Sequence, residues 1–180
     1  QRLVPFNSAV HVRMNPETAS FQFERHALHN APVEHLRLFL EHYQPLHPYG
    51  QSGVWKYNIN KSVRLTDITP LPQLRETEYF QDFMTFMPAQ YELNHMLGSQ
   101  GDPVGILGLH RKKGERNFSD REREIMDYIL PHLSRAVHNL SLLEAVTDAY
   151  GIGIVEVGAD RTMRPINDEA KRVLSISRGA

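Results

Sequence analysis

Aromatic and methionine side chains in the middle of the chain have the types and spacing that suit binding of a small molecule. They are Trp55, Tyr57, Phe80, Phe83 and Met87. Side chains of this kind line small-molecule pockets, and the flexible thioether of methionine adapts to varied ligand shapes. The same residue types also fill hydrophobic cores, so both interpretations stay open. If a pocket forms, we expect it between a sheet and residues 44–87, with His95 as a polar partner from the sheet.

Patterns for catalysis and metal binding are missing from the sequence. It has no cysteine, which excludes disulfides, thiolate metal sites and cysteine nucleophiles. Neither a G-x-x-x-x-G-K-[ST] phosphate loop nor a G-x-S-x-G nucleophile elbow occurs. The ten histidines form no H-E-x-x-H motif, and the glycines of "YGIGIVEVG" are wrongly spaced for a dinucleotide fingerprint. We therefore expect no enzyme activity, no catalytic residues, no cofactor and no metal.

The composition is that of a globular domain, with 180 residues of which 41% are apolar and 23% charged. A formal net charge of −1 gives no basic excess of the kind that nucleic-acid-binding domains show. No apolar run approaches the roughly 20 residues needed to span a bilayer, and no signal peptide opens the chain. Because the sequence begins at Gln1 and stops at "SISRGA", we interpret it as a piece of a longer protein. We expect that protein to be cytoplasmic and without membrane contact.

Hydrophobic periodicity predicts an α+β domain built on an antiparallel sheet. The predicted strands are 8–14 paired with 19–25, a short strand at 63–68, and 89–98 paired with 103–113. Helical spacing predicts a helix over 32–43, and the segment 71–87 is typical of one broken helix or two short ones. Between them, residues 44–62 form a long loop, of the kind that often carries function in compact domains. Strands arranged as hairpins with helices between them indicate an antiparallel sheet.

The sequence then predicts a long helix over 119–147, opened by a capping box between Ser119 and Glu122. Apolar residues recur along it at helical spacing: Ile129, Leu133, Val137 and Leu140. This stripe runs further than a small domain would cover, so we expect two copies of the chain to pair along it as a homodimer. Pro131 lacks a backbone donor, so we expect a bend between a sensor half and a signalling half of the helix.

Five segments of the chain resemble the N-terminal sensor region of LuxR-type bacterial transcriptional regulators. They are "FLEHYQPLHPYG", "VRLTDITP", "YFQDFM", "GILGLHRKKGERNFSDREREIMDYILPHLSRAV" and "GIGIVEVGADRTMRPINDEAKRVL". The most specific matches are Phe118, Ser119, Glu122, Leu130, Pro131, His132, Leu133, Arg135 and Ala136. In that group a GAF-like domain ends in a long helix, and a PAS-like hairpin and a helix-turn-helix domain follow.

The resemblance implies a GAF-like sensor domain over 1–147, with 148–180 as the start of a PAS-like β-β-α segment or a linker. It implies an unknown small-molecule ligand, and DNA binding only through a C-terminal domain absent from this chain. The acyl-homoserine-lactone receptors of the LuxR type carry W-x-x-x-Y followed by Asp. Here Trp55 and Tyr57 are only two apart, with Asp67 downstream, so the sequence departs from that pattern.

Three other functions stay open at the level of sequence. A lactone receptor domain remains an alternative within the same family. A purely structural dimerisation module would explain the long helix, although it would leave the aromatic-rich loop unexplained. A small hydrolase would require a nucleophile, a base and an orienting group, and no such set can be identified in the sequence.

Overall fold

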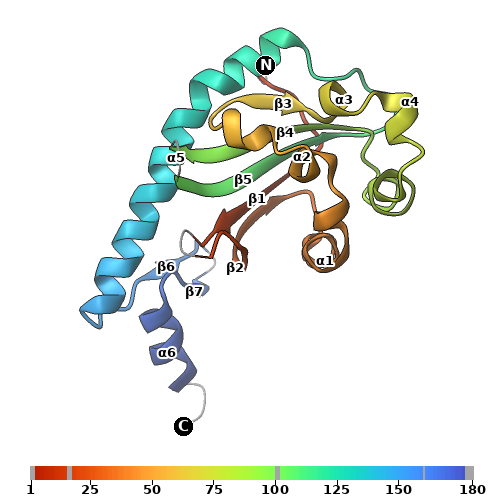
Figure 1. Cartoon of the computed structure of the whole chain (residues 1–180). Helices are drawn as coiled ribbons and strands as arrows, with labels where there is room; N and C mark the ends of the chain where they lie inside the picture. The colour runs from red at the N-terminus through yellow and green to blue at the C-terminus, as the bar shows by residue number, and fades with distance from the viewer. Residues whose placement is uncertain (1–2, 16–17, 100–101, 160, 177–180) are drawn as a thin grey trace. The chain divides into compact units, whose positions relative to one another are not determined.

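The computed structural model describes residues 3–15, 18–99, 102–159 and 161–176. Five antiparallel strands form one sheet in the order β2-β1-β5-β4-β3, which confirms the predicted α+β class (Figure 1). The strands are β1 (Ser8–Met14), β2 (Phe21–His29), β3 (Ser62–Arg64), β4 (Tyr91–Ser99) and β5 (Asp102–Arg111). Both predicted hairpins are present, and β1 pairs with β5 to join them into one sheet.

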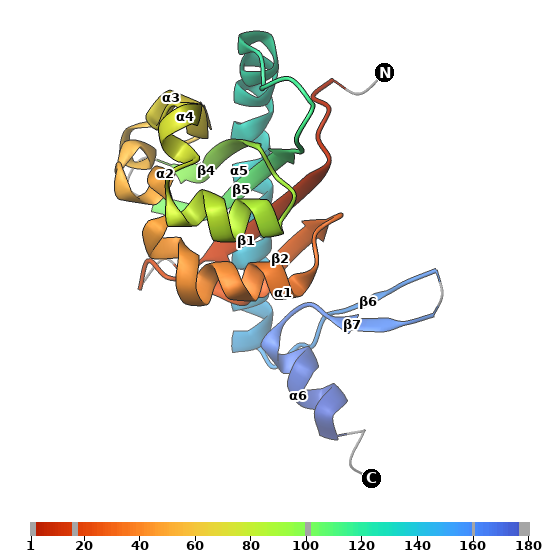
Figure 2. The ribbon, with the colours of Figure 1, turned by 90° about the vertical axis from the view of Figure 1, so that its right-hand side faces the viewer.

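Short helices cover one face of this sheet (Figure 2). They are α1 (Val33–Leu38) with its π-helical continuation η1 (Phe39–Tyr43), the 3-10 turns η2 (Gln44–Leu46) and η3 (Val54–Tyr57), α2 (Pro48–Gln51), α3 (Leu65–Ile68), α4 (Leu71–Leu74) and the π-helical η4 (Tyr79–Met84). The predicted helix over 32–43 is confirmed. For residues 71–87 the sequence left open one broken helix or two short ones, and the structure has two short helices. The predicted loop 44–62 contains several helical turns.

The strand predicted over 63–68 is wrong in its second half. Only Ser62–Arg64 pairs with β4, and the chain turns into α3 from Leu65 onward. Two local contacts favour the turn: the Thr69 amide donates to the Leu65 carbonyl at 3.0 Å, and Arg64 pairs with Asp67 at 3.0 Å. This turn leaves β3 as a very short edge strand, a form that limits edge-to-edge pairing between sheets.

The hydrophobic core of this part of the chain lies between the sheet and its helical cover. One cluster of it consists of Tyr49, Val63, Leu65, Leu74, Tyr79, Phe83, Met84 and Ala89. Leu65, Leu74 and Met84 are fully buried, at 0% exposure. Burial of apolar side chains is the dominant favourable contribution to folding, so this cluster holds the cover against the sheet.

The long helix α5 (Asp120–Ala149) packs on the opposite face of the sheet through its first half (Figure 2). The capping box is confirmed: the Ser119 amide donates to Glu122 Oε2 at 2.7 Å, and the Glu122 amide donates to Ser119 Oγ at 3.3 Å. Leu130 is fully buried, and Ser134 still accepts a hydrogen bond from the Gly98 amide at 2.9 Å. Sheet contact therefore extends past Pro131, and the helix is continuous through it. A bend of the axis at Pro131 stays a prediction.

The chain divides into two compact units, 1–135 and 136–180, and the division falls inside α5. The second unit holds the end of α5, a hairpin of β6 (Val155–Val157) and β7 (Met163–Pro165), and α6 (Asp168–Ile176). Its order of strand, strand and helix is the one predicted. The domain boundary at residue 147 stays a prediction, because compactness alone does not define where a domain folds. No helix of the described residues is both long and apolar enough to cross a membrane.

Candidate ligand-binding site

Two adjoining cavities lie between the sheet and the helices that cover it. The smaller has a volume of about 60 Å³ and the larger a volume of about 370 Å³. Phe21, Phe39, His47 and Ile106 line both of them, so the two cavities are neighbours with a shared wall. Small-molecule sites are typically concave and mostly apolar with a few placed polar groups, and these cavities have that form.

Strand alternation supplies the floor of the smaller cavity. Successive side chains of a strand point to opposite faces, so Glu92 and Asn94 of β4 share one face, and Gly108 and His110 of β5 share it with them. Glu92 is directly opposite His110 in the β4–β5 register, and Asn94 is opposite Gly108. The floor therefore places a few polar side chains among apolar ones such as Val10, Val12 and Ile106, while the walls above it are largely aromatic and aliphatic.

A buried carboxylate, Glu92, stands at the centre of this floor with an exposure of 2%. The His47 ring donates from Nε2 to Glu92 Oε2 at 3.0 Å, and the Tyr79 hydroxyl donates to Oε1 at 2.7 Å. Asn94 donates a longer hydrogen bond to Oε2, at 3.4 Å. The polar cluster thus joins β4, η4 and the residue before α2 around one carboxylate.

Burial and hydrogen bonding oppose each other at Glu92. Burial by itself would raise the pKa of this carboxyl, but the hydrogen bond and charge of His47, with help from His110 and Tyr79, lower the pKa to about 2. Burial, together with the nearby carboxylate, raises the pKa of Tyr79 well above its ordinary value. Glu92 is therefore ionised and Tyr79 is a neutral donor throughout the physiological range.

The structure brings three of the six sequence-predicted pocket residues to the cavities. Phe83 and Met87 line the smaller cavity, and Trp55 lines the larger one. Tyr57 lines neither, and its side chain is 89% exposed on the η3 turn. Phe80 lines neither as well, because it lies on η4 beside the core cluster.

His95 lies on the other face of the sheet, away from both cavities. It is one residue out of phase with Glu92 and Asn94, so alternation directs it toward α5. The ring is fully buried, and its Nδ1 contacts the Leu107 carbonyl at 2.9 Å. Burial lowers the pKa of His95 to about 4, so the ring is neutral near pH 7.

Sequence reasoning missed the Glu92 cluster. Its members lie far apart along the chain and give no motif: His47, Tyr79, Glu92, Asn94 and His110. One signal was available, since Glu92 is a lone carboxylate in a predicted strand whose neighbours are mostly apolar. A buried strand rarely carries an unpaired charge, so Glu92 implied a partner from elsewhere.

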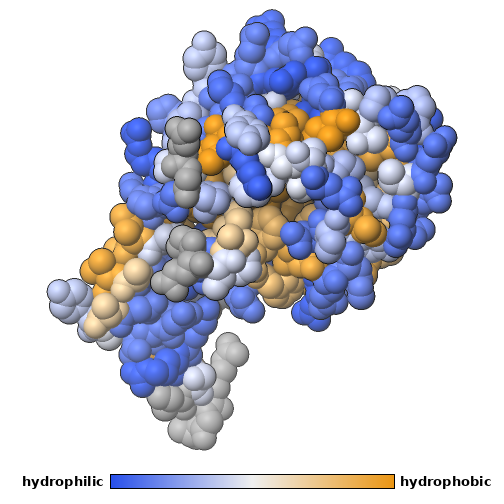
Figure 3. Space-filling view, in the orientation of Figure 1, coloured by the Kyte–Doolittle hydropathy of each residue, from blue (hydrophilic) through white to orange (hydrophobic). Residues whose placement is uncertain are grey.

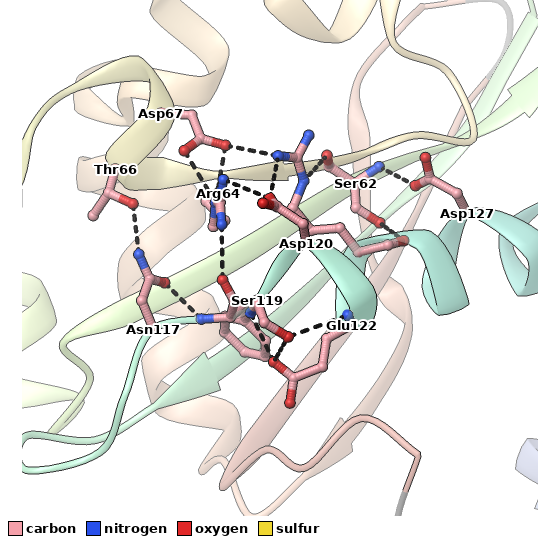
Figure 4. Close-up of polar contacts among 11 residues, drawn as sticks. Ser62, Arg64, Thr66, Asp67, Asn117, Ser119, Asp120, Glu122 and Asp127 are labelled. Carbon is pink, nitrogen blue, oxygen red and sulfur yellow. Dashed lines mark hydrogen bonds and ion pairs between the residues drawn. The ribbon is translucent and has the colours of Figure 1, made fainter.

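Polar contacts connect the β3–α3 segment to the first turns of α5 (Figure 4). The Ser62 amide donates to Asp127 Oδ1 at 2.7 Å, and Arg64 donates to the Phe118 carbonyl at 3.0 Å. Arg64 also pairs with Asp120 at 3.1 Å. The edge of the sheet is thereby fixed to the start of the long helix.

The same β3–α3 segment contacts the cavity side through alternate residues. Val63 and Leu65 are buried in the core cluster, which also contains the cavity-lining Tyr79 and Phe83. Residues 62–67 thus have one set of side chains against the cavity wall and another against α5. Residues 62–67 therefore link the core cluster to α5 by direct contacts.

No protein-family model matches the sequence, and no curated protein matches it. Among solved structures, the chain is similar to a GAF domain/HD domain protein from Geobacter sulfurreducens, with a TM-score of 0.56 and 17% identity over 78% of this chain and 85% of that one. It is similar to the LBD domain of VqsR from Pseudomonas aeruginosa, with a TM-score of 0.54 and 13% identity over 74% and 76% of the two chains. It is also similar to the GAF domain of a two-component sensor histidine kinase from Bacillus halodurans, with a TM-score of 0.51 and 14% identity over 78% of this chain and 87% of that one. The chain therefore has a GAF-like fold.

Proposed function

We propose that the chain is a sensor region of a LuxR-type transcriptional regulator and that it binds a small molecule in the cavities beside Glu92. The observation that carries this proposal is the ionised, buried carboxylate on the floor of an apolar cavity. A buried carboxylate costs desolvation energy that well-packed apolar residues avoid, so stability alone gives little reason for Glu92 at this position. The GAF-like fold supports the proposal, and so does the similarity to the LBD domain of VqsR.

The proposed signal leaves the cavity through the β3–α3 segment. A ligand that moves the cavity wall would move Val63 and Leu65, and through Ser62 and Arg64 it would shift the start of α5. Helix shifts of 1–2 Å are a common form of allosteric transition. In the parent protein, α5 would pass this shift toward a C-terminal DNA-binding domain in the cytoplasm.

A thermal-shift screen with a small-molecule library tests the cavity. A compound that binds the native state raises its unfolding midpoint by mass action, and a concentration of 100 Kd adds about 2.7 kcal/mol. Gly108→Val should abolish the shifts of compounds that occupy the smaller cavity, which Gly108 lines. A Cβ at Gly108 meets no atom closer than 3.4 Å, so valine fits the strand while its methyl groups enter the cavity.

Tyr57→Ser is the matched control, since it changes an exposed side chain outside both cavities. It should keep every shift seen with the unmodified chain. Shifts that survive Gly108→Val would place binding outside the smaller cavity and away from Glu92, and a library without any stabilising compound would favour a purely structural module.

We also propose that α5 mediates a homodimer. Leu133 and Leu140 are exposed at 36% and 40%, while Ile129 and Val137 are half-buried. Leu142, Leu143 and Val146 are exposed at 53%, 50% and 54%, and Figure 3 shows apolar side chains gathering over this end of α5. An exposed apolar helix surface of this kind suits a second copy of the same helix.

Leu140→Glu should weaken the dimer at least about tenfold, because it places a charge in the apolar centre of the interface. Light scattering at about 50 µM, well above a micromolar dissociation constant, should give the mass of two chains for the unmodified protein and a lower mass for the variant. Tyr57→Glu, an equally polar change at an exposed aromatic residue off the helix, should leave the dimer intact. The mass of one chain for the unmodified protein would rule the dimer out.

A further inference from the structure

We infer that the ligand carries a primary ammonium group on an apolar body, and that the ammonium group hydrogen-bonds to Glu92. This inference rests on the proposed function, since it names the chemical class of the molecule that the same cavities would bind. Three features of the site lead to it: the charge of the lining residues, the free acceptor capacity of Glu92, and the aromatic walls.

The described lining of the two cavities contains an acidic side chain but no lysine or arginine. Among the described residues that line the two cavities, Glu92 is the only carboxylate, and neither a lysine nor an arginine is present. The basic groups there are the histidines His35, His47 and His110. Burial lowers the pKa of His110, against the pull of Glu92, and so favours its neutral form. Apart from histidine rings, the described lining therefore has one carboxylate and no basic side chain, and the nearest ring to the carboxylate is His47 at 3.0 Å.

Glu92 retains room for one more hydrogen-bond donor. An ionised carboxylate has about four acceptor positions. His47 and Asn94 both donate to Oε2, whereas Tyr79 is the donor to Oε1. A ligand N–H that reached Oε1 would complete the set. Charge-assisted hydrogen bonds of this type are roughly twice as strong as neutral ones.

Aromatic rings form the walls above the carboxylate. Phe39 lies 5.6 Å from Phe83 between ring centroids, and Tyr79 lies 5.5 Å from Phe83. The faces of such rings attract a cation, and the attraction grows when the cation is removed from water. Phe39 and Ile106 also line the larger cavity, together with Trp55. That cavity has space for the apolar body of a ligand.

Calorimetric titration of the whole chain with three probes tests the inference. The probes are 4-phenylbutylamine, 4-phenylbutan-1-ol and N,N,N-trimethyl-4-phenylbutylammonium. They share one apolar body and differ in charge and in N–H donors. We expect the primary amine to bind at least about tenfold more tightly than the alcohol, as a charged hydrogen bond in a buried site requires. The primary amine should also bind more tightly than the trimethyl compound by a similar factor, because the trimethyl compound has no N–H to donate.

Glu92→Gln should remove the preference, so that amine and alcohol bind within about threefold of each other. If this variant does not fold, the comparison of the three probes on the unmodified chain still decides the matter. Equal binding of amine and alcohol there would overturn the ammonium inference and leave the sensory cavity standing. The ammonium inference would also be overturned if none of the three probes bound, while library compounds still stabilised the unmodified chain and failed to stabilise Gly108→Val. If neither the probes nor any library compound binds, both proposals fall.

Discussion

Replacing Arg111 by methionine is expected to lower the free energy of unfolding of residues 1–135 by about 3–5 kcal/mol. Arg111 is 2% exposed and its partner Glu122 is 4% exposed. The guanidinium donates to Glu122 Oε1 at 2.8 Å and to the Pro5 carbonyl at 2.7 Å, and it stacks 4.1 Å over the Phe118 ring. Methionine would replace the volume but would remove the buried charged partner of the Glu122 carboxylate and the donor to the Pro5 carbonyl. Urea unfolding followed by circular dichroism measures the loss.

Arg116→Met is the matched control, because Arg116 also contacts Glu122, at 3.6 Å, but with a side chain that is 79% exposed. Exposed pairs contribute little, so this variant should lose less than about 1 kcal/mol. If the two variants lost equal stability, the buried Arg111–Glu122 pair would not be the contact that stabilises the start of α5.

The pH dependence of the Arg111 effect follows from the pKa of Glu122. Burial by itself would raise this pKa, but hydrogen bonds from Arg111 and Ser119 outweigh burial and lower it from 4.5 to about 2. A depressed pKa in the folded state adds stability above the unfolded value, and that stability is lost as the pH falls. The difference between the unmodified chain and Arg111→Met should therefore shrink between pH 4.5 and about pH 2. A difference that stays constant over this window would contradict the assignment.

Asn167→Ala is expected to unfold the hairpin and helix of the second unit. Asn167 is fully buried, and its side chain accepts from the amides of Ile154 at 2.8 Å and Ala170 at 3.1 Å. Its amide group donates to Thr147 Oγ1 at 3.0 Å and to the Ile152 carbonyl at 2.7 Å. Alanine would leave these groups unpaired, at a cost of about 2–4 kcal/mol.

A unit as small as 136–180 has little stability to lose, so this cost should exceed what it has. Hydrogen exchange followed by mass spectrometry should show lost protection over 152–176 and unchanged protection in β4 and β5. Lys171→Ala, which breaks only the exposed pair with Asp168, serves as control and should exchange like the unmodified chain. Retained protection in Asn167→Ala would show that the hairpin does not depend on this side chain.

The sequence predicted those parts of the structure that depend on neighbouring residues. Alternation along 8–14 and 19–25 predicted a hairpin because strand pairing across a short turn is local. The Ser119–Glu122 capping box was predictable for the same reason, since the two residues are one helical turn apart.

The candidate site was only partly predictable, because it is assembled from residues distant in the chain. The contact between His47 and Glu92 depends on how the cover folds over the sheet, and no spacing encodes it. His95 and Glu92 lie in one strand, and only the register decides which of them faces the cavity. Tyr57 belongs to an aromatic-rich stretch, yet the η3 turn directs it outward while Trp55 lines the cavity.

The methionine methyl groups offer the most direct measurement of ligand binding in the cavities. Met87 lines the smaller cavity and Met14 and Met96 line the larger, whereas Met163 lies in β7 of the second unit. NMR spectra of the chain labelled with ¹³C at the methionine methyl groups should be recorded with the compound that most raises the unfolding midpoint. We expect the Met87 and Met96 signals to shift as the compound is added, while the Met163 signal stays in place. A Met163 signal that shifts while Met87 and Met96 do not, or a library without any stabilising compound, would contradict it.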